Sequence, residues 1–265
     1  MIIFLQATVE GLSLAAIYSL VAIGFVLIYK AMEVLSFAQP ALAVVGAGII
    51  SSLAVDRGIP FWLALFLGVI LTGILGLLIE RTFLRPMVGE PVFSVAVLTI
   101  GIDILLRTVL DSWIGINPKY MGDPFPSYGN FGAIKLGGVN IKYLELAALI
   151  TAILLIILLT IFFRKSKYGI AMRATSYDQE AAMAQGINVG RIFGLVWLIA
   201  GILAAFAGFF ITGGFNTLSQ FSFISALRAL PAVVIGGLDS IPGAVVGSII
   251  ILSLIHISEP TRQAS

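Results

Sequence analysis

Long apolar stretches, each close to the length of a membrane-spanning helix, constrain this chain more than any other feature of its sequence. An α-helix needs about 20 apolar residues to cross the hydrocarbon core of a bilayer. Hydrophobic residues make up 60% of the sequence and charged residues 11%, whereas soluble domains are about 45–50% apolar. A chain with so little polar surface cannot face water on all sides. We therefore expect an integral membrane protein whose spans form one domain.

The spans are expected to be helices, because a helix satisfies every backbone hydrogen bond inside lipid and the alternating pattern of barrel strands is absent. The predicted fold is all-α, a polytopic transmembrane helix bundle of about eight spans with the last one truncated. Glycines such as Gly76, Gly201 and Gly208 predict close helix–helix packing. The predicted spans cover about 9–29, 37–55, 61–80, 92–110, 144–163, 192–212 and 222–238, and an eighth begins near Ala244.

Positively charged residues indicate which ends of the spans face the cytoplasm, because cytoplasmic loops carry an excess of Lys and Arg near the span ends. The larger set on one side is Lys30, Arg81, Arg85, Arg164, Lys165, Lys167, Arg173 and Arg191. The smaller set on the other side is Arg57, Lys119, Lys135 and Lys142. We therefore place the N-terminus and the loop at 111–143 outside, and the loop at 164–191 in the cytoplasm.

The composition excludes several kinds of site. The chain has no Cys and a single His, His256, so it offers no disulfide framework, thiolate metal site, cysteine nucleophile or histidine metal cluster. A net charge of +2 is too small to suggest nucleic-acid binding. The sequence also lacks the Gly-x-x-x-x-Gly-Lys-Ser/Thr phosphate loop. We therefore expect no cofactor and no catalytic residue, and any ATP chemistry must belong to a partner.

A polar stretch, SYDQEAAMAQGINVGRI, interrupts this apolar chain at 176–192. Ser176 followed by Gln179 is a capping-box pattern, and Gly186 followed by an apolar residue is typical of a helix C-terminus. These signals predict a helix of roughly ten residues, about 15 Å long, with a small and mildly polar face that suits a groove on another protein. The alternative is a helix lying on the membrane, which would favour bulky apolar residues and a basic face.

Four segments of the chain carry a resemblance to a known family. The coupling loop of ABC importer permeases is similar to Glu180, Ala181 and Ala182 followed by Gly186. Branched-chain amino acid permeases of the LivH type resemble the chain at VLSFAQPALAVVGAG (34–48), LIERTFLRP (78–86) and ALRALPAVVIGGLDSIPGAVVG (226–247). The four segments follow the order of the family, and the resemblance runs from about residue 10 to 251.

The resemblance implies the inward transport of branched-chain or other hydrophobic amino acids by a multi-pass permease of a bacterial or archaeal cytoplasmic (inner) membrane. The permease would pair with a paralogous second permease, and a periplasmic or extracellular binding protein would deliver the substrate. Two cytosolic ATPases would each receive one coupling helix. On this interpretation the chain is not an enzyme. Its ATPase-coupling residues would be Glu180, Ala181, Ala182 and Gly186.

Other functions remain open. The same kind of permease serves importers of urea or short-chain amides. An ion-coupled secondary transporter would need a carboxylate near the middle of a span, for which Asp103 is the candidate. An intramembrane serine protease would need a Ser–His or Ser–Lys pair, which the predicted spans lack. Co-purification of an ATPase would separate the importer from the other classes.

A few residues within or beside the spans are candidates for the substrate pathway. Asp103 and Arg107 are four residues apart, which predicts either an internal ion pair or a functional site. Arg228 could bind the carboxylate of an amino acid or anchor to lipid headgroups.

The segment from Ser36 to Pro40 is also a pathway candidate. Pro40 fits the first turn of a helix, and the helix start could direct free N–H groups into a pathway, as broken helices do in transporters. The alternative is an ordinary start of a span. The predicted pathway residues are Phe37, Gln39, Pro40 and Arg228.

The last residues do not fit the family pattern, which predicts a final apolar span after Ile251. LSLIHISEPTR, from Leu252 to Arg262, resembles one reading frame of a transposase adapter used in sequencing libraries. We therefore divide the chain into a transmembrane permease domain at 1–251 and a tail at 252–265 that we expect to be non-native. The alternative is a genuine short polar tail.

Overall fold

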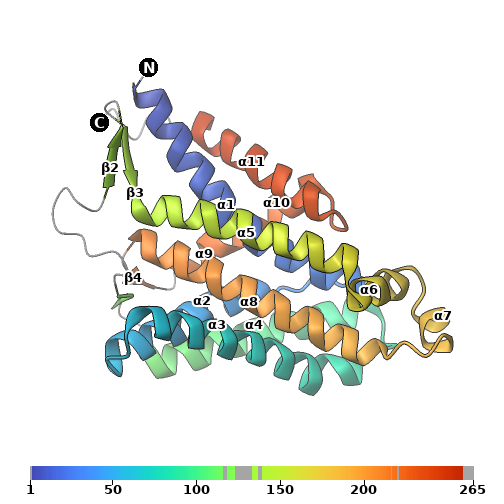
Figure 1. The fold of residues 1–265 in the computed structure, drawn as a ribbon. Coiled ribbons are helices and arrows are strands. Elements are labelled where there is room, and N and C mark those ends of the chain that lie inside the picture. The colour runs from blue at the N-terminus through green and yellow to red at the C-terminus, as the bar shows by residue number, and fades with distance from the viewer. Residues whose placement is uncertain are drawn as a thin grey trace.

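A computed structural model describes residues 2–115, 118–122, 133–136, 139–215, 217–219 and 221–258. It is a bundle of long helices with two small pairs of strands at one end (Figure 1). The long helices are α1 (Ile2–Met32), α2 (Gln39–Ser51), α3 (Phe61–Ile79), α4 (Val92–Ile114), α5 (Tyr143–Lys165), α8 (Val189–Phe215) and α11 (Ile241–Ser258). The short helices are α6 (Lys167–Tyr177), α7 (Gln179–Ala184), α9 (Phe221–Leu227) and α10 (Ala229–Gly236).

Several connections have their own regular structure. Antiparallel pairs form between β1 (Lys119–Tyr120) and β4 (Thr217–Leu218) and between β2 (Ala133–Leu136) and β3 (Val139–Lys142). Two π-helical turns, η1 (Ser52–Asp56) and η2 (Glu80–Leu84), extend α2 and α3, and a 3₁₀ turn, η3 (Arg85–Met87), follows the second. The tail predicted to be non-native lies partly in α11, and its residues 259–265 lie outside the described part of the chain.

The all-α transmembrane bundle is confirmed, but the number of long spans differs from the prediction. Within the described ranges, six helices are long and apolar enough to cross a membrane. A further pair, 222–236 and 241–251, is bent by 117°, and counting it as one span gives seven. The predicted seventh span is two short helices that meet at Arg228. The chain turns back after Gly237, whose φ of 93° favours glycine.

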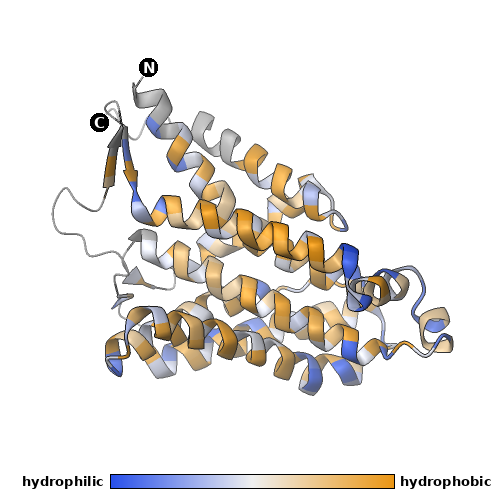
Figure 2. Ribbon diagram, viewed as in Figure 1, coloured by the Kyte–Doolittle hydropathy of each residue, from blue (hydrophilic) through white to orange (hydrophobic). Residues whose placement is uncertain are grey.

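Burial is uneven across the bundle. Helix α8 packs against α1, α2 and α3, and most of α1, α2 and α8 is buried. In contrast, most of α3, α4 and α5 is not buried, although these helices are largely apolar along their length (Figure 2). Trp62, Phe66 and Phe93, for example, are exposed. Exposed bulky apolar rows of this length belong against lipid or another membrane subunit.

Glycines allow the buried helices to approach closely, as the sequence predicted. A Cβ atom on Gly208 of α8 would overlap the backbone carbonyl of Ala43 in α2. A Cβ on Gly201 would lie 2.6 Å from the carbonyl oxygen of Thr72 in α3. Side chains at these positions would push the backbones apart, so the packing of α8 depends on their absence.

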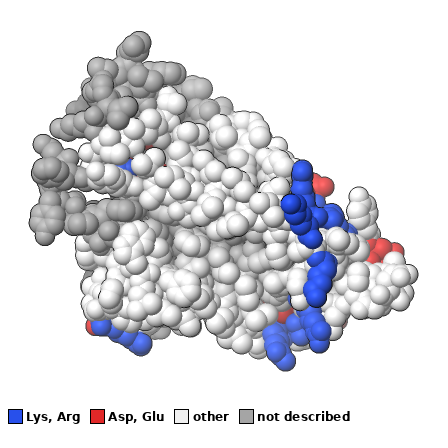
Figure 3. All heavy atoms as spheres, viewed as in Figure 1, with Lys and Arg blue, Asp and Glu red and all other residues white. Residues whose placement is uncertain are grey.

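Positive charge gathers at one end of the bundle. Figure 3 shows a band of Lys and Arg at the end that carries α6 and α7 in Figure 1. Lys30 lies in the last turn of α1, and Arg164 and Lys165 lie in the last turn of α5. We call this the inner end, because the positive-inside rule places it in the cytoplasm. The N-terminus lies at the opposite, outer end (Figure 1).

Candidate functional site

The segment predicted to couple to a partner forms α7, which protrudes from the inner end of the bundle (Figure 1). The predicted cap, Ser176, is wrong. Its hydroxyl donates to the carbonyl of Arg173, 2.9 Å away, in the last turn of α6. The N-cap of α7 is Asp178, whose Oδ1 accepts from the backbone N–H of Ala181 at 2.9 Å. Asp is as good an N-cap as Ser. Because Asp178 caps α7, Ser176 is free to belong to α6, which extends to Tyr177. Helix α7 therefore has six residues rather than the predicted ten.

The predicted C-terminal cap of α7 is confirmed. Gly186 has a φ of 81°, and its N–H donates to the carbonyl of Met183 at 2.9 Å. The N–H of Ile187 donates to the carbonyl of Ala182 at 3.0 Å. These two bonds form a Schellman motif, which requires a left-handed residue at the glycine position.

The surface that α7 presents is small but contains two large side chains. Glu180 and Ala181 are exposed, whereas Ala182 is buried against the protein. Tyr177 and Met183 flank the helix and are 91% and 53% exposed. An exposed tyrosine and an exposed methionine beside a face of small alanine side chains are suited to contact a protein surface.

A second feature of the inner end joins α3 to the first turn of α8. The side chain of Glu80 is 0% exposed and accepts hydrogen bonds from Arg85 at 3.2 Å (Nε) and 3.0 Å (Nη2). The same Nη2 donates to the carbonyl of Gly190 at 2.8 Å. We call Glu80, Arg85 and Gly190 the inner clamp. A Cβ on Gly194 would lie 3.2 Å from Glu80 Oε2, so the glycine in α8 leaves room for the carboxylate.

Sequence reasoning did not select the inner clamp as a site. The available signal was a carboxylate at the end of an apolar span, five residues before an arginine. The π-helical turn η2 at this place is another feature often found at functional sites.

Of the predicted pathway residues at the start of α2, Gln39 and Pro40 are buried in the bundle, and Phe37, just before the helix, is half-buried. Pro40 lies in the first turn, as predicted. Gln39 is 0% exposed and its Nε2 donates to the carbonyl of Ala200 at 3.1 Å. The N–H of Phe37 donates to the hydroxyl of Thr99 at 3.1 Å. These contacts tie the start of α2 to α8 and α4. Phe37, Gln39 and Pro40 are not among the residues that line the pocket at Arg228.

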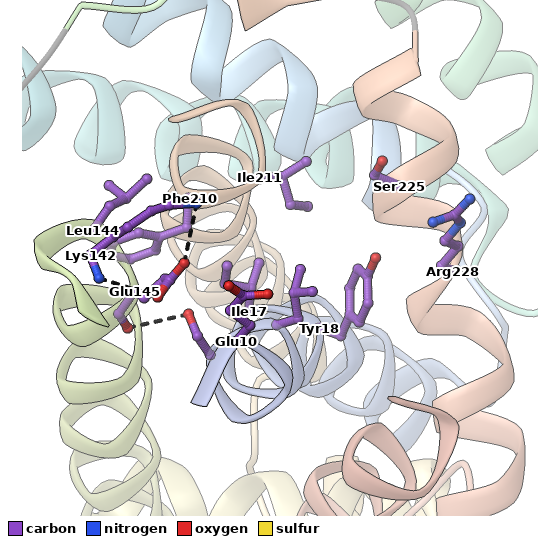
Figure 4. Close-up of a pocket in the computed structure, with 12 residues that line it drawn as sticks. Glu10, Ile17, Tyr18, Lys142, Leu144, Glu145, Phe210, Ile211, Ser225 and Arg228 are labelled. Carbon is purple, nitrogen blue, oxygen red and sulfur yellow. Dashed lines mark hydrogen bonds and ion pairs between the residues drawn. The ribbon is translucent and has the colours of Figure 1, made fainter. Parts of the chain in front are cut away.

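Arg228 lines a pocket of about 260 Å³ between α1, α5, α8 and α9 (Figure 4). Tyr18, Ser225 and Arg228 gather on one side of it, where the hydroxyl of Tyr18 faces the positively charged Arg228. Glu10 and Glu145 lie on the other side, where Lys142 pairs with Glu145 at 3.5 Å. Apolar side chains lie between the two polar groups: Ile17 and Ile211.

Asp103 and Arg107 form the ion pair that their spacing predicted. The guanidinium of Arg107 also lies over the ring of Phe223, 4.1 Å from its centroid, and so connects α4 to α9. Among the described residues, the buried carboxylates of the spans are Asp103 and Glu80, and each is paired with an arginine. Both oxygens of Glu80 accept from Arg85, whereas Asp103 is held through Oδ2 and its buried Oδ1 has no hydrogen-bond partner among the described residues.

The comparison with protein families decides what kind of membrane protein this is. The family model described as "Branched-chain amino acid transport system / permease component" matches residues 7–258. The chain belongs to this family. The match confirms the resemblance drawn from the four sequence segments, and it covers α7, the inner clamp and the pocket.

Individual relatives agree with the family. BraD of Pseudomonas aeruginosa, a high-affinity branched-chain amino acid transport system permease protein, is 28% identical over 94% of this chain and 84% of its own length. LivH of Escherichia coli, which has the same description, is 27% identical over 94% of this chain and 83% of its own. A probable LivH of Methanocaldococcus jannaschii is 28% identical over 89% and 76%. The comparison with solved structures gave no match.

Proposed function

We propose that the chain is a permease subunit of an ATP-driven importer in the cytoplasmic membrane of a bacterium or archaeon. With a paralogous second permease it would form the path for branched-chain or other hydrophobic amino acids. Two cytosolic ATPases would drive it, and an external binding protein would supply the substrate. Family membership and the names of BraD and LivH support this proposal. The observation that carries the coupling role is α7, a capped helix protruding from the positively charged end.

The position of α7 explains how a partner would move the bundle. After the Schellman turn at Gly186, the side chain of Asn188 accepts from the N–H of Arg191 at 3.0 Å and caps α8. Helix α8 in turn packs against α1, α2 and α3. A displacement of α7 by an ATPase would therefore be transmitted to α8 through a link of two residues, Ile187 and Asn188. Glu180, Ala181, Ala182 and Gly186 are the coupling residues in this proposal.

Two features support an amino acid substrate over the alternatives. Arg228 in the pocket offers a positive charge to a carboxylate, which amino acids have and urea and short amides lack. The pairing of Asp103 and Glu80 with arginine disfavours an ion-coupled mechanism. The importer is therefore the function that the described residues support best.

Gly186→Val is expected to lower substrate-stimulated ATP hydrolysis by the complete importer about tenfold. The left-handed conformation at Gly186 costs a β-branched residue about 1–2 kcal/mol, so the turn that fixes α7 would change shape. Glu180→Lys changes the exposed face of α7 without touching this turn and is expected to act in the same direction. Both variants are assayed in proteoliposomes with the binding protein and leucine.

Gly58→Val is the matched control for Gly186→Val. Gly58 also has a positive φ, of 63°, and a Cβ there would meet nothing within 4 Å, but it lies in the outer loop after η1. With Gly58→Val, leucine should stimulate ATP hydrolysis as it does in the wild type. All three variants should be present in the membrane at the wild-type amount. Normal stimulation in both α7 variants would refute the coupling assignment.

A further inference from the structure

We propose that the pocket at the joint of α9 and α10 binds the carboxylate of the transported amino acid, with Arg228 as the counter-charge and Tyr18 as a hydrogen-bond donor. This inference rests on the proposed transport function and assigns residues to it. Nothing in the family match or in the names of the relatives places a substrate group at these positions.

The depth of the pocket shows that Arg228 is an intramembrane charge. Tyr18 lies ten residues after Thr8 and fourteen before Met32 in the first span, about 15 Å and 21 Å along the helix axis. The hydrocarbon core is about 30 Å thick, so Tyr18 and the arginine beside it lie near its middle. Headgroups at that distance are out of reach of an arginine side chain. A charge at this depth is costly and indicates function.

Arg228 is available to a ligand. Its side chain is exposed at the pocket, and no carboxylate among the described residues lies within ion-pair distance of it. Arg107 and Arg85, in contrast, are each paired with a buried carboxylate, Asp103 and Glu80. A guanidinium without such a partner binds a carboxylate with two hydrogen bonds in a fixed geometry.

The acidic side of the pocket has a different role. Glu10 and Tyr18 are eight residues apart on α1, which is about 12 Å, whereas the two charged groups of an amino acid share one carbon atom. We therefore assign the carboxylate to the side of Arg228 and place Glu10 nearer the outer end of the pocket. Lys142 offsets Glu145, and Glu10 leaves the outer side negative. This side attracts the ammonium group of an entering substrate and repels acidic amino acids.

The wall between the two polar sides fits an apolar substituent. Ile17 and Ile211 lie between Glu10 and Arg228 in Figure 4. With the carboxylate of the substrate bound to Arg228, the side chain of valine, leucine or isoleucine would pack against Ile17 and Ile211. Its apolar surface would then be removed from water. The ligand class is therefore a neutral amino acid with an apolar side chain.

The absence of cysteine from the chain allows a direct test of occupancy. Ser225→Cys places one thiol on the side of Arg228, and Ile211→Cys places one on the apolar wall between the two polar sides. Membranes that contain the complete importer are treated from outside with a charged methanethiosulfonate, and labelling of this subunit is measured by mass. Saturating leucine is expected to slow labelling at both positions about tenfold. Leucinamide, which lacks the carboxylate, should not protect.

Two controls isolate the role of the arginine. Ser112→Cys, exposed near the outer end of α4, should label at the same rate with and without leucine. Adding Arg228→Gln to Ser225→Cys should remove the protection, whereas adding Arg57→Gln, which removes an exposed positive charge at the outer end, should keep it.

The outcomes separate this inference from the proposed function. An importer that takes up no leucine would refute the function itself. Leucine uptake without protection, protection by leucinamide, or protection that survives Arg228→Gln would refute the carboxylate site alone. Thiols at Ser225 and Ile211 that do not react at all would also refute it, because the pocket would then be closed to the outside.

Discussion

Arg85→Gln is expected to lower the free energy of unfolding of the permease by about 3 kcal/mol. The change leaves the carboxylate of Glu80, which is 0% exposed, without the guanidinium that pairs with it. Removing one partner of a buried ion pair costs about 3–5 kcal/mol, and the lower end applies here because the side chain of Arg85 is itself 39% exposed. The hydrogen bond from Arg85 to the carbonyl of Gly190 is lost as well.

Thermal unfolding of the detergent-solubilised permease measures this effect. A loss of about 3 kcal/mol corresponds to a fall in Tm of about 6–12 °C for a chain of this length. Arg81→Gln is the matched control, because it removes the same charge from the same segment at an exposed position and should shift the Tm by no more than about 2 °C. An equal fall in Tm for Arg81→Gln would show that general charge at the inner end, and not the inner clamp, stabilises the protein.

The double variant Glu80→Gln/Arg85→Gln tests the pairing itself. Replacing both members of a buried pair by neutral residues removes the uncompensated charge, so the double variant should be more stable than Arg85→Gln alone. If the two single changes were simply additive, the residues would not be acting as a pair.

The inner clamp also bears on transmission from α7. Gly190 lies in the first turn of α8, four residues after the glycine that ends the Schellman turn. Arg85 holds this turn to the end of α3. Under the proposed coupling role, a movement of α7 would therefore displace α3 and α8 together rather than bend α8 alone. In this proposal the clamp positions the link.

The sequence predicted the features that depend on local composition. Hydropathy located the six long spans within a few residues, because their length and apolarity are set by the bilayer. The left-handed glycine at Gly186 and the ion pair of Asp103 with Arg107 follow from short-range spacing. The last two predictions involve residues no more than about one helical turn apart, and both are confirmed.

Other features depend on choices that local patterns leave open. Ser176 and Asp178 are both good N-caps, and Asp178 has the role because α6 extends to Tyr177. The predicted seventh span reads as one apolar segment, but it is divided at Arg228 and turned back at Gly237 by contacts with α1 and α11. The inner clamp joins positions 105 residues apart, and no single-sequence pattern reports such a distance.

The start of α2 shows the same limit in the pathway prediction. The signals for a helix beginning at Gln39 and Pro40 were right. Whether that start faces a pathway depends on α4 and α8, which contact it through Thr99 and Ala200, and the pathway role stays a prediction. Conversely, Tyr18 gave no signal in the sequence, and it enters the candidate site only because α1 passes beside the joint at Arg228.

Gly208→Val is expected to have the largest effect on folding, lowering the free energy of unfolding by more than about 4 kcal/mol. A Cβ at this position would overlap the carbonyl oxygen of Ala43 and lie 2.6 Å from its carbonyl carbon. A flexible side chain could rotate away from such an overlap, but the backbone of α2 cannot. On the neighbouring turn, a Cβ on Gly46 would lie 2.8 Å from the Cα of Ala205, so α2 cannot slide along α8 to make room.

Gly101→Val provides the control that makes this prediction specific. Gly101 lies within the α4 span, and a Cβ there would meet nothing within 4 Å, so both variants replace a helical glycine inside the membrane by the same residue. Gly208→Val should reduce the amount of folded permease recovered in detergent to a small fraction of wild type, whereas Gly101→Val should recover normally. Equal recovery would mean that α2 and α8 have freedom to separate. Because α8 also continues from the link to α7, that freedom would weaken the proposed route by which ATPase motion enters the bundle.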